Sequence, residues 1–186
     1  VSTHRADTES TWQFSNNSAL VLLDYMRDTE HGLNEDIANI NLAELAASAD
    51  VCDQDVSLSA GGTQKRFTCD GQLDTRASFK SNIENILSSM IGTCAYSAGQ
   101  FHITAHYYKT PDTNVIDETM MVGGLQVVTK PSRRKLYNAV KGQFISEEEN
   151  YVVADYPAQT SSTYATADGE TIYLDLTHTM VTNTIR

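Results

Sequence analysis

Apolar residues recur at helical spacing near the start of the chain, in the stretch NNSALVLLDYMRDTEHGL, residues 16–33. The spacing i, i+3, i+4 and i+7 places four apolar side chains on one helical face: Ala19, Leu22, Leu23 and Met26. Asn17 or Ser18 can cap the start of this helix. Gly32 is well placed to supply the left-handed residue that ends it. A helix of about three turns is marginal in isolation, so we expect it to pack on another element.

The same spacing predicts two further helices. One covers about 41–53, where Asn41 and Glu44 favour a capping-box start. The other covers about 76–91, with Thr75 as its cap and Gly92 at its end. Its apolar stripe contains Phe79, Ile83, Ile86, Leu87 and Met90.

Alternating apolar positions predict strands around the third helix. Phe67, Cys69 and Leu73 alternate after the turn expected at Gly61-Gly62. A hairpin is predicted around Ala98-Gly99, because apolar residues alternate on both sides of it: Cys94, Tyr96, Phe101, Ile103 and Ala105. Residues 1–108 are therefore expected to form a helical pair followed by a βαββ layer, an α+β arrangement with helices covering one face of a small sheet.

Beyond a linker at Lys109–Thr113, which contains Pro111, the pattern changes to strands. One predicted strand alternates at Leu125, Val127 and Thr129, and a short one at about 151–155 is expected to stop at Pro157. In a longer strand, one face takes Leu136, Asn138, Val140, Gly142 and Phe144, and the other takes Tyr137, Ala139 and Lys141. A last strand, with alternating Ile172, Leu174 and Leu176, follows a turn at Asp168-Gly169.

These strands predict an antiparallel sheet or a partial barrel. We therefore divide the chain into an α+β subdomain at 1–110 and a β-rich subdomain at 111–186, the second incomplete at its C-terminal end. The first ten residues lack the apolar block of a signal peptide, and there is no initiator Met. We expect the chain to be an internal piece of a longer protein.

Composition narrows the function. The 186 residues are 40% hydrophobic and 20% charged, which suits a folded core, and no apolar run is long enough to span a membrane. The net charge of −11 disfavours binding to nucleic acid, because phosphates are repelled by an acidic surface. The basic cluster Lys130–Lys135, KPSRRK, could neutralise an acidic partner but is more simply a charged strand entry.

Three cysteines, Cys52, Cys69 and Cys94, are an odd number at long spacings without a C-x-x-C motif. This pattern argues against a disulfide framework or a zinc knuckle and favours free, buried thiols.

Candidate catalytic and metal-binding residues are few. His102 and His106 lie in a predicted strand, where four residues span about 13 Å, too far for both to bind one zinc ion. Glu170 and Asp175, with Glu147–Glu149, could be catalytic carboxylates but fit solvated loops better. The aspartates Asp50, Asp53 and Asp55 lack the other features of a calcium loop. No nucleophile-elbow, P-loop, metalloprotease or dinucleotide-binding motif occurs, so we expect no catalytic, cofactor-binding or metal residues.

Several segments resemble, in order, those of phage tail tip and central tail hub proteins, the family of the lambda-type tip attachment protein J. NNSALVLLDYMRDTEHGL is similar to the motif N-P-A-x-x-x-x-D-x-x-T-x-x-x-x-G-L, and VCDQ to V-C-D-E. QKRFTCDGQLDTRASFKSNIENIL resembles K-R-Y-T-C-N-G-x-L-D-T with its following helix. PSRRKLYNAVKGQFISEEENYVVADYP resembles R-R-x-x-x-N-x-V-x-G-x-F-x-x-P-x-x-x-Y, and DGETIYLDLTHTMV resembles the acidic strand that follows. Ser18 replaces the usual proline, and Glu147–Glu149 replace an Asp-Pro turn. The resemblance covers about residues 12–186.

The resemblance implies a structural, non-enzymatic domain of a homotrimeric hub at the distal end of a phage or prophage tail. Such a hub links the tail tube to the fibre that contacts the host, and it assembles with distal tail and tape measure proteins in the host cytoplasm. The implied location is the virion, and neither nucleic acid nor a membrane is an implied partner. Under this hypothesis, Val152, Tyr156 and Ile172 lie near a sheet edge that another segment pairs.

Two other hypotheses remain. A receptor- or carbohydrate-binding module would use exposed aromatic side chains such as Trp12 and the pair Tyr107-Tyr108. A tail-associated cell-wall hydrolase would need a cleft with converging carboxylates.

Overall fold

A computed structural model describes most of the chain. The described residues are 8–11, 13–57, 61–108, 117–121, 123–124, 126–127, 129, 132, 136–146, 149–164, 171–177 and 180. They fall into two compact units. The first lies within Val1–His106, Gly142–Tyr156 and Leu176–Arg186, and the second within Tyr107–Lys141 and Pro157–Asp175.

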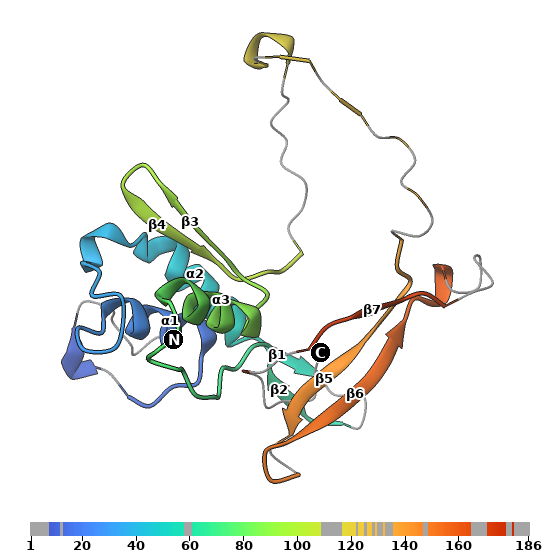
Figure 1. Ribbon diagram of the computed structural model, residues 1–186, viewed down its shortest axis with the longest axis horizontal. Helices are drawn as coiled ribbons and strands as arrows, with labels where there is room; N and C mark the ends of the chain where they lie inside the picture. The colour runs from blue at the N-terminus through green and yellow to red at the C-terminus, as the bar shows by residue number, and fades with distance from the viewer. Residues whose placement is uncertain are drawn as a thin grey trace. The chain divides into compact units, whose positions relative to one another are not determined.

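The described residues form helices and several small sheets, so the predicted α+β class is confirmed; they form no closed barrel (Figure 1). The helices are α1 (Ser18–Arg27), α2 (Leu42–Cys52) and α3 (Phe79–Ser89), with single 3₁₀ turns at η1 (Glu9–Thr11), η2 (Ile37–Asn39) and η3 (Glu118–Met120). The strands are β1 (Asp55–Ser57), β2 (Thr63–Lys65), β3 (Thr93–Ser97), β4 (Gln100–Thr104), β5 (Ala139–Ser146), β6 (Val152–Thr160) and β7 (Tyr173–Asp175).

Helix α1 forms where the apolar periodicity predicts it, with Asn17 as its cap. The Asn17 side chain accepts hydrogen bonds from the backbone N–H groups of Ala19 and Leu20. The expectation that Gly32 is the left-handed residue was wrong, because the positive φ, 55°, belongs to Asn34. Gly32 is needed for close approach instead: a Cβ there would lie 2.0 Å from the backbone oxygen of Tyr25.

Helix α3 is shorter than predicted at its start. Thr75 lies in a turn in which the Asp74 backbone oxygen accepts a hydrogen bond from the N–H of Ala77. Ser78 caps the helix, and its side chain accepts from the N–H of Ser81. At the other end, the left-handed residue is Ile91, with φ 50°, not Gly92.

The core of the first unit lies among the three helices and the β3–β4 hairpin. Helix α1 packs against both α2 and α3, and α2 packs against β4. A buried hydrogen bond of 3.0 Å from Asn82 Nδ2 on α3 to the Tyr25 hydroxyl on α1 adds a polar tie. The large apolar side chains that are fully buried here are Leu22, Met26, Ile86, Met90 and Ile103.

The strands around these helices form two separate hairpins rather than the single βαββ layer expected. β1 pairs with β2, and β3 with β4, both antiparallel. The β3–β4 hairpin turns at Ala98-Gly99 as predicted, where both residues have positive φ. The strand predicted at Phe67–Leu73 does not form: Phe67 and Cys69 are buried, but the segment pairs in the manner of a strand only through the isolated bridge between Thr68 and Asn17.

The remaining strands form a three-stranded sheet in the order β6-β5-β7. β5 and β6 run in opposite directions in Figure 1, as an antiparallel sheet requires. β7 pairs with the other side of β5 and runs parallel to it, with Ala139 opposite Tyr173. The sheet is therefore mixed rather than wholly antiparallel.

β6 continues through Pro157, where we expected a stop. Proline lacks the N–H that a central strand must donate, but β6 is an edge strand of this sheet, so the missing donor is tolerated.

The predicted alternation holds over only part of β5. Gly142 and Phe144 are buried, and Lys141 and Gln143 are exposed. Ala139, expected on the face of Lys141, is also buried, and Leu136, expected on the face of Gly142, is exposed. In β7, Leu174 is half-buried between exposed Tyr173 and Asp175.

Some predictions lie outside the described residues. These are the linker around Pro111, the domain boundary at residue 110 and the turn at Asp168-Gly169. The strand expected around Leu125 falls where the structure describes only isolated residues, and those are not in a strand. The division into 1–110 and 111–186 stays a prediction.

Candidate functional site

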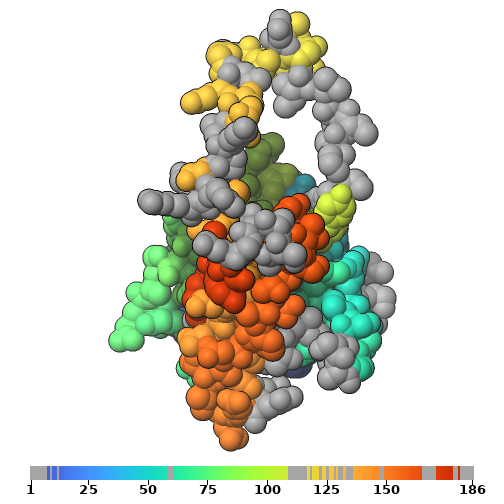
Figure 2. Space-filling model, turned by 90° about the vertical axis from the view of Figure 1, so that its right-hand side faces the viewer, coloured from blue at the N-terminus to red at the C-terminus, as the bar shows by residue number. Residues whose placement is uncertain are grey.

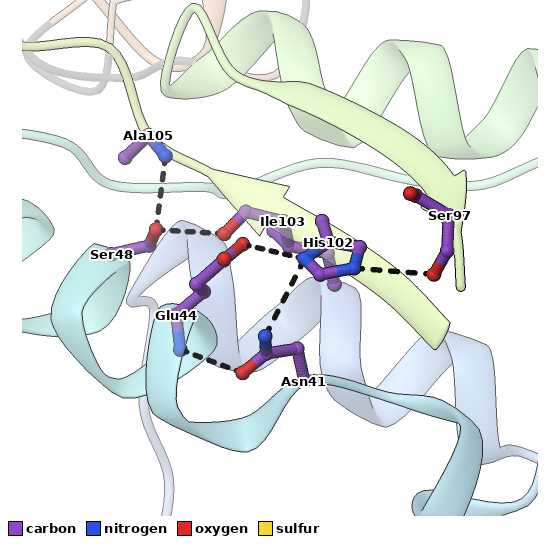
Figure 3. Close-up of polar contacts among 7 residues, drawn as sticks. All are labelled: Asn41, Glu44, Ser48, Ser97, His102, Ile103 and Ala105. Carbon is purple, nitrogen blue, oxygen red and sulfur yellow. Dashed lines mark hydrogen bonds and ion pairs between the residues drawn. The ribbon is translucent and has the colours of Figure 1, made fainter. Parts of the chain in front are cut away.

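The histidine that raised the question of a metal site, His102, lies in a polar cluster where β4 meets α2 (Figure 3). Its Nδ1 is 3.0 Å from Oε2 of Glu44 and 3.4 Å from Nδ2 of Asn41. Its Nε2 is 3.3 Å from the backbone oxygen of Ser97 on β3. The Glu44 carboxylate and the Ser97 carbonyl are acceptors and the Asn41 amide nitrogen is a donor, so Nδ1 either donates to Glu44 or accepts from Asn41, according to the tautomer of the ring.

This cluster is partly open to solvent: the His102 side chain is 28% exposed and that of Glu44 45%. Ion pairs at that exposure contribute only about 0.2–1 kcal/mol to stability. Of the two hydrogen bonds of the predicted capping box, the one from the Glu44 N–H to the Asn41 side chain forms, at 3.2 Å, and the Glu44 carboxylate contacts His102 instead.

Ser48 on α2 completes the contact with β4. Its hydroxyl donates to the backbone oxygen of Ile103 and accepts from the N–H of Ala105, each at 3.0 Å. These are bonds that a neighbouring strand would otherwise make, and Asn41 N–H adds another to the Phe101 oxygen at 3.0 Å. Helix α2 and the residues before it thereby cover the outer edge of β4.

The chemistry of this cluster is that of a structural tie. The Ser48 hydroxyl proton is committed to the Ile103 carbonyl, which leaves it poorly placed to be a nucleophile. The signal that could have located Ser48 is its position between Leu45 and Ala49, on the apolar face of α2. A polar side chain on a buried face needs a hydrogen-bond partner.

The two histidines are not brought together on a helix. His102 is in β4, as the predicted strand required, and His106 follows the strand and is exposed. Among the described residues, no three or more His, Cys, Asp or Glu side chains form a group that could hold a metal ion.

The carboxylates considered as catalytic are only partly described. Glu149 and Asp175 are exposed, and Glu147, Glu148 and Glu170 lie outside the described residues. Of the aspartates compared with a calcium loop, Asp55 is 3.0 Å from Lys65 Nζ.

Cys52 and Cys69 are buried free thiols, as predicted, and Cys94 is half-buried. Burial raises the pKa of the Cys94 thiol above its ordinary value. The reactive thiolate form is therefore scarce at neutral pH, which suits packing rather than nucleophilic chemistry.

The aromatic residues considered for receptor binding are only partly described. Tyr107 and Tyr108 are exposed, the latter by 84%, and Trp12 lies outside the described residues. The described helices include none with the length and apolarity to cross a membrane.

Comparison with known proteins gives one informative similarity. The chain is 26% identical over 140 residues to the protein named tip attachment protein J of Escherichia phage SECphi27. The aligned region covers 74% of this chain but only 12% of that protein, so the chain spans a small part of its relative's length. No family model matches the chain. The similarity supports a structural role in a phage tail in general.

Proposed function

We propose that this chain is a structural domain of the central hub at a phage or prophage tail tip. In this proposal it acts without enzymatic activity, as part of a homotrimer that links the tail tube to the host-contacting fibre. Its direct partners are other copies of itself and neighbouring tail proteins, including the distal tail and tape measure proteins. Contact with the host surface is indirect.

The main support for the proposal is the structural role of the residues that match the tail-tip motifs. In the first segment, Asn17 caps α1 and Gly32 permits close approach to Tyr25. In a later segment, a Cβ at Gly142 would lie 1.6 Å from the Leu176 backbone oxygen. Asn17 therefore caps a helix, and the two glycines allow close backbone contacts. Residues in these roles stabilise the fold, as expected of a structural domain.

The similarity to tip attachment protein J supports the more general part of the proposal, a structural role in a phage tail, because it extends along 140 residues rather than one motif. The low share of that relative, 12%, fits a chain that is one domain of a much longer protein.

Labelling of intact tails tests the proposed location. The Ala98-Gly99 turn is exposed and suits a short inserted tag, because hairpin turns tolerate insertions. The full-length protein carrying this tag is assembled into tails, and gold particles are located by electron microscopy. We expect the label at the distal end of the tail.

The number of copies is measured on the same full-length protein by light scattering. A trimeric mass together with a distal label supports the hub role. A label along the tube, or on a side fibre, contradicts it. Clearing of peptidoglycan in a gel assay by the purified protein would favour the hydrolase hypothesis instead.

A receptor- or carbohydrate-binding module is the second candidate, favoured by the exposed Tyr107 and Tyr108. Replacing both by Ser should then abolish adsorption to cells while tails assemble normally. The double replacement Tyr96→Ser with Tyr164→Ser is a control, since both tyrosines are also exposed. Equal adsorption by the two double variants and the parent phage would contradict this candidate.

A further inference from the structure

The β3–β4 hairpin has one strand edge that α2 covers and another that it does not. On β4, the backbone oxygen of Phe101 accepts a hydrogen bond from the Asn41 N–H. The backbone oxygen of Ile103 accepts one from the Ser48 hydroxyl (Figure 3). Phe101 and Ile103 therefore direct their backbone polar groups away from β3 and toward α2.

The register of the hairpin then fixes which backbone groups of β3 face outward. In an antiparallel pair, a residue whose N–H and C=O point away from the partner strand lies opposite a residue whose groups also point away. Phe101 lies opposite Tyr96, and Ile103 lies opposite Cys94. The N–H and C=O groups of Tyr96 and Cys94 therefore lie along the outer edge of β3. Among the described residues, β4 alone pairs with β3 in this two-stranded sheet.

The outer edge of β3 carries none of the features that usually keep a strand edge from pairing with another chain. Its sequence, TCAYS, has no charged residue and no proline. All its side chains except that of Cys94 are exposed, and Tyr96 is 65% exposed. An edge of this kind can be extended by a strand from another chain through main-chain hydrogen bonds.

Most other strand edges in the described part of the chain are short and charged. β1 and β2 have three residues each and carry an ion pair of 3.0 Å between Asp55 and Lys65. β7 also has three residues and ends with the exposed Asp175. Short length and charge both disfavour pairing with a further strand, so these edges are poor candidates.

The edge of β6 is the exception. β6 lies at the outside of its sheet, and its residues 152–156, before Pro157, match β3 in length. Val152 and Val153 are exposed by 57% and 58%. The charged residue in this part, Asp155, accepts a hydrogen bond of 3.0 Å from the Gln143 side chain. Because the net charge of −11 makes copies of this chain repel each other, weakly charged edges are the surfaces best suited to self-association.

We infer that β3 of one copy of this chain pairs with residues 152–156 of β6 in a neighbouring copy. The inference rests on the proposed homotrimer. A closed ring of three copies needs two different, complementary surfaces on each copy, and the edges of β3 and β6 supply them. The backbone groups of Cys94 and Tyr96 form the hydrogen bonds on the β3 side of this interface.

Cross-linking in the full-length protein tests which edges meet. Copies carrying Ala95→Cys, at the middle of β3, are co-expressed with copies carrying Val153→Cys on β6, and the assembly is treated with a short bis-maleimide. Paired strands lie about 4.8 Å apart, within reach of the reagent. We expect a product that joins the two kinds of copy, with the link between positions 95 and 153 identified by mass spectrometry.

The control pair replaces Ala95→Cys by Tyr164→Cys. Tyr164 is as exposed as Tyr96, at 65%, but lies outside the strands. We expect at least about tenfold less linked product from this pair, because paired strands bring only the two edges within reach of the reagent.

Removal of one outward amide tests the hydrogen bonds themselves. Tyr96→Pro in the full-length protein removes the outward N–H and leaves the bonds between β3 and β4, to which this N–H does not contribute. Tyr96→Ser is the matched control, because it changes the side chain and keeps the N–H. We expect Tyr96→Pro to weaken trimer association by at least about tenfold, and Tyr96→Ser by less than about threefold, in light scattering over a dilution series. Circular dichroism checks that each variant is folded.

The outcomes separate this pairing from the trimer itself. A wild-type protein of trimeric mass, with no more 95–153 product than the control pair gives, overturns the inference and leaves the proposed trimer standing. Links between position 95 of two copies also overturn it, because β3 would then pair with itself. A monomeric wild-type mass contradicts the proposed trimer and the pairing together. The cross-linking result does not depend on whether Tyr96→Pro folds.

Discussion

The Asn17 side chain connects two segments of the chain, and the neighbouring Asn16 backbone connects a third. Its Oδ1 caps α1, and its Nδ2 donates to the Ala49 backbone oxygen on α2 at 2.9 Å. Next to it, the Asn16 oxygen accepts the Cys69 N–H at 2.8 Å, so the segment before α3 is tied to the same place. The side chain is almost fully buried, which keeps water from competing for these bonds.

Replacing Asn17 should separate its two roles. Asn17→Ala removes both the cap and the bridge to Ala49, and we expect a loss of about 2 kcal/mol in the free energy of unfolding. Asn17→Ser keeps a capping oxygen and should lose only about 1 kcal/mol. Urea unfolding followed by circular dichroism measures both, and equal losses would contradict a separate contribution from the bridge.

Ser18 shows an opportunity for stabilisation. It is fully buried, and in the described part of the chain its hydroxyl has no hydrogen-bond partner. It is the first residue of α1, the position that proline prefers in helices and where the resembled motif has proline. The preceding Asn17 has φ −66° and ψ 119°, a conformation compatible with a following proline.

We therefore expect Ser18→Pro to raise the free energy of unfolding by about 1 kcal/mol, because it restricts the unfolded chain and removes an unpaired hydroxyl. Ser18→Ala is the control, since it removes the hydroxyl without restricting the backbone. Thermal and urea unfolding measure both variants. A Ser18→Pro protein less stable than Ser18→Ala would show that the site cannot hold the ring.

Among the glycines that the structure describes, Gly142 is the one where an added Cβ would come closest to another atom. Its added Cβ would meet the backbone of Leu176 rather than a flexible side chain, so the backbone at one of these two positions must move. We expect Gly142→Ala to cost about 2–3 kcal/mol of unfolding free energy. Gly124→Ala is the matched control, because a Cβ there meets nothing within 4 Å, and its effect should stay under about 1 kcal/mol. Similar losses in the two variants, measured by urea unfolding, would contradict this role of Gly142.

At the scale of elements, the positions of the helices could be predicted because their apolar stripes and caps lie within a few residues of each other. Their ends could not. The start of α3 depends on a competing turn, in which the Asp74 carboxylate accepts hydrogen bonds from the Arg76 backbone N–H at 2.9 Å and its guanidinium at 3.1 Å. Thr75 lies within that turn, and the N-cap of α3 is Ser78 instead.

The Asp74 turn gives a pH-dependent prediction. The Arg76 side chain, followed by the Arg76 backbone N–H, holds the pKa of Asp74 below its ordinary value of 3.8. The unfolded chain therefore binds the proton more tightly than the folded one. The stability that this group contributes is present above pH 3.8 and is lost as the pH falls through the lower folded value.

NMR titration of the Asp74 carboxyl carbon checks this prediction. In Arg76→Gln, the pKa should move back toward its ordinary value, because the charged partner is gone. Lys80→Gln on α3 is a control that removes a positive charge from another exposed ion pair, with Glu84. An Asp74 pKa that is unchanged by Arg76→Gln would contradict the assigned cause.

Strands were predictable only where the information is local. The β3–β4 hairpin has its turn residues and its alternation within the span from Thr93 to Thr104. The parallel pairing of β5 with β7 joins residues such as Val140 and Leu174, which no local pattern relates. Pro157 misled the prediction because it is an obstacle only in a central strand, and the place of β6 in the sheet is a tertiary property.

At the scale of the whole molecule, the polar cluster at β4 also depends on contacts between residues far apart in the sequence, which local patterns do not predict. The strand position of His102 could be predicted, and with it the distance from His106. Its partner Glu44 lies 58 residues away in sequence, and Ser48 lies 55 residues from Ile103. Such contacts arise from the packing of α2 on β4, so the sequence analysis named His102 and Glu44 separately but predicted neither the role of Ser48 nor the association of these residues.

The proposed trimer makes a last prediction about the edge of the three-stranded sheet. Of the residues expected there, Tyr156 is buried and its hydroxyl is bonded to Leu176, while Ile172 is bonded to Asn138. Val152 differs: it is 57% exposed at the start of β6, an edge strand that Figure 2 shows in orange on the molecular surface. Exposed apolar side chains on a sheet edge favour pairing with another chain.

We therefore expect the β6 amides from Val152 to Ala154 to exchange at least about tenfold more slowly in the full-length trimer than in the isolated chain. The α1 amides serve as the internal control and should be protected equally in both, because α1 is bonded within its own unit. The measurement is hydrogen exchange with mass spectrometry on the two samples under the same conditions. Equal exchange of β6 in both would mean that this edge stays open in the assembly, and the trimer would then have to form through other surfaces.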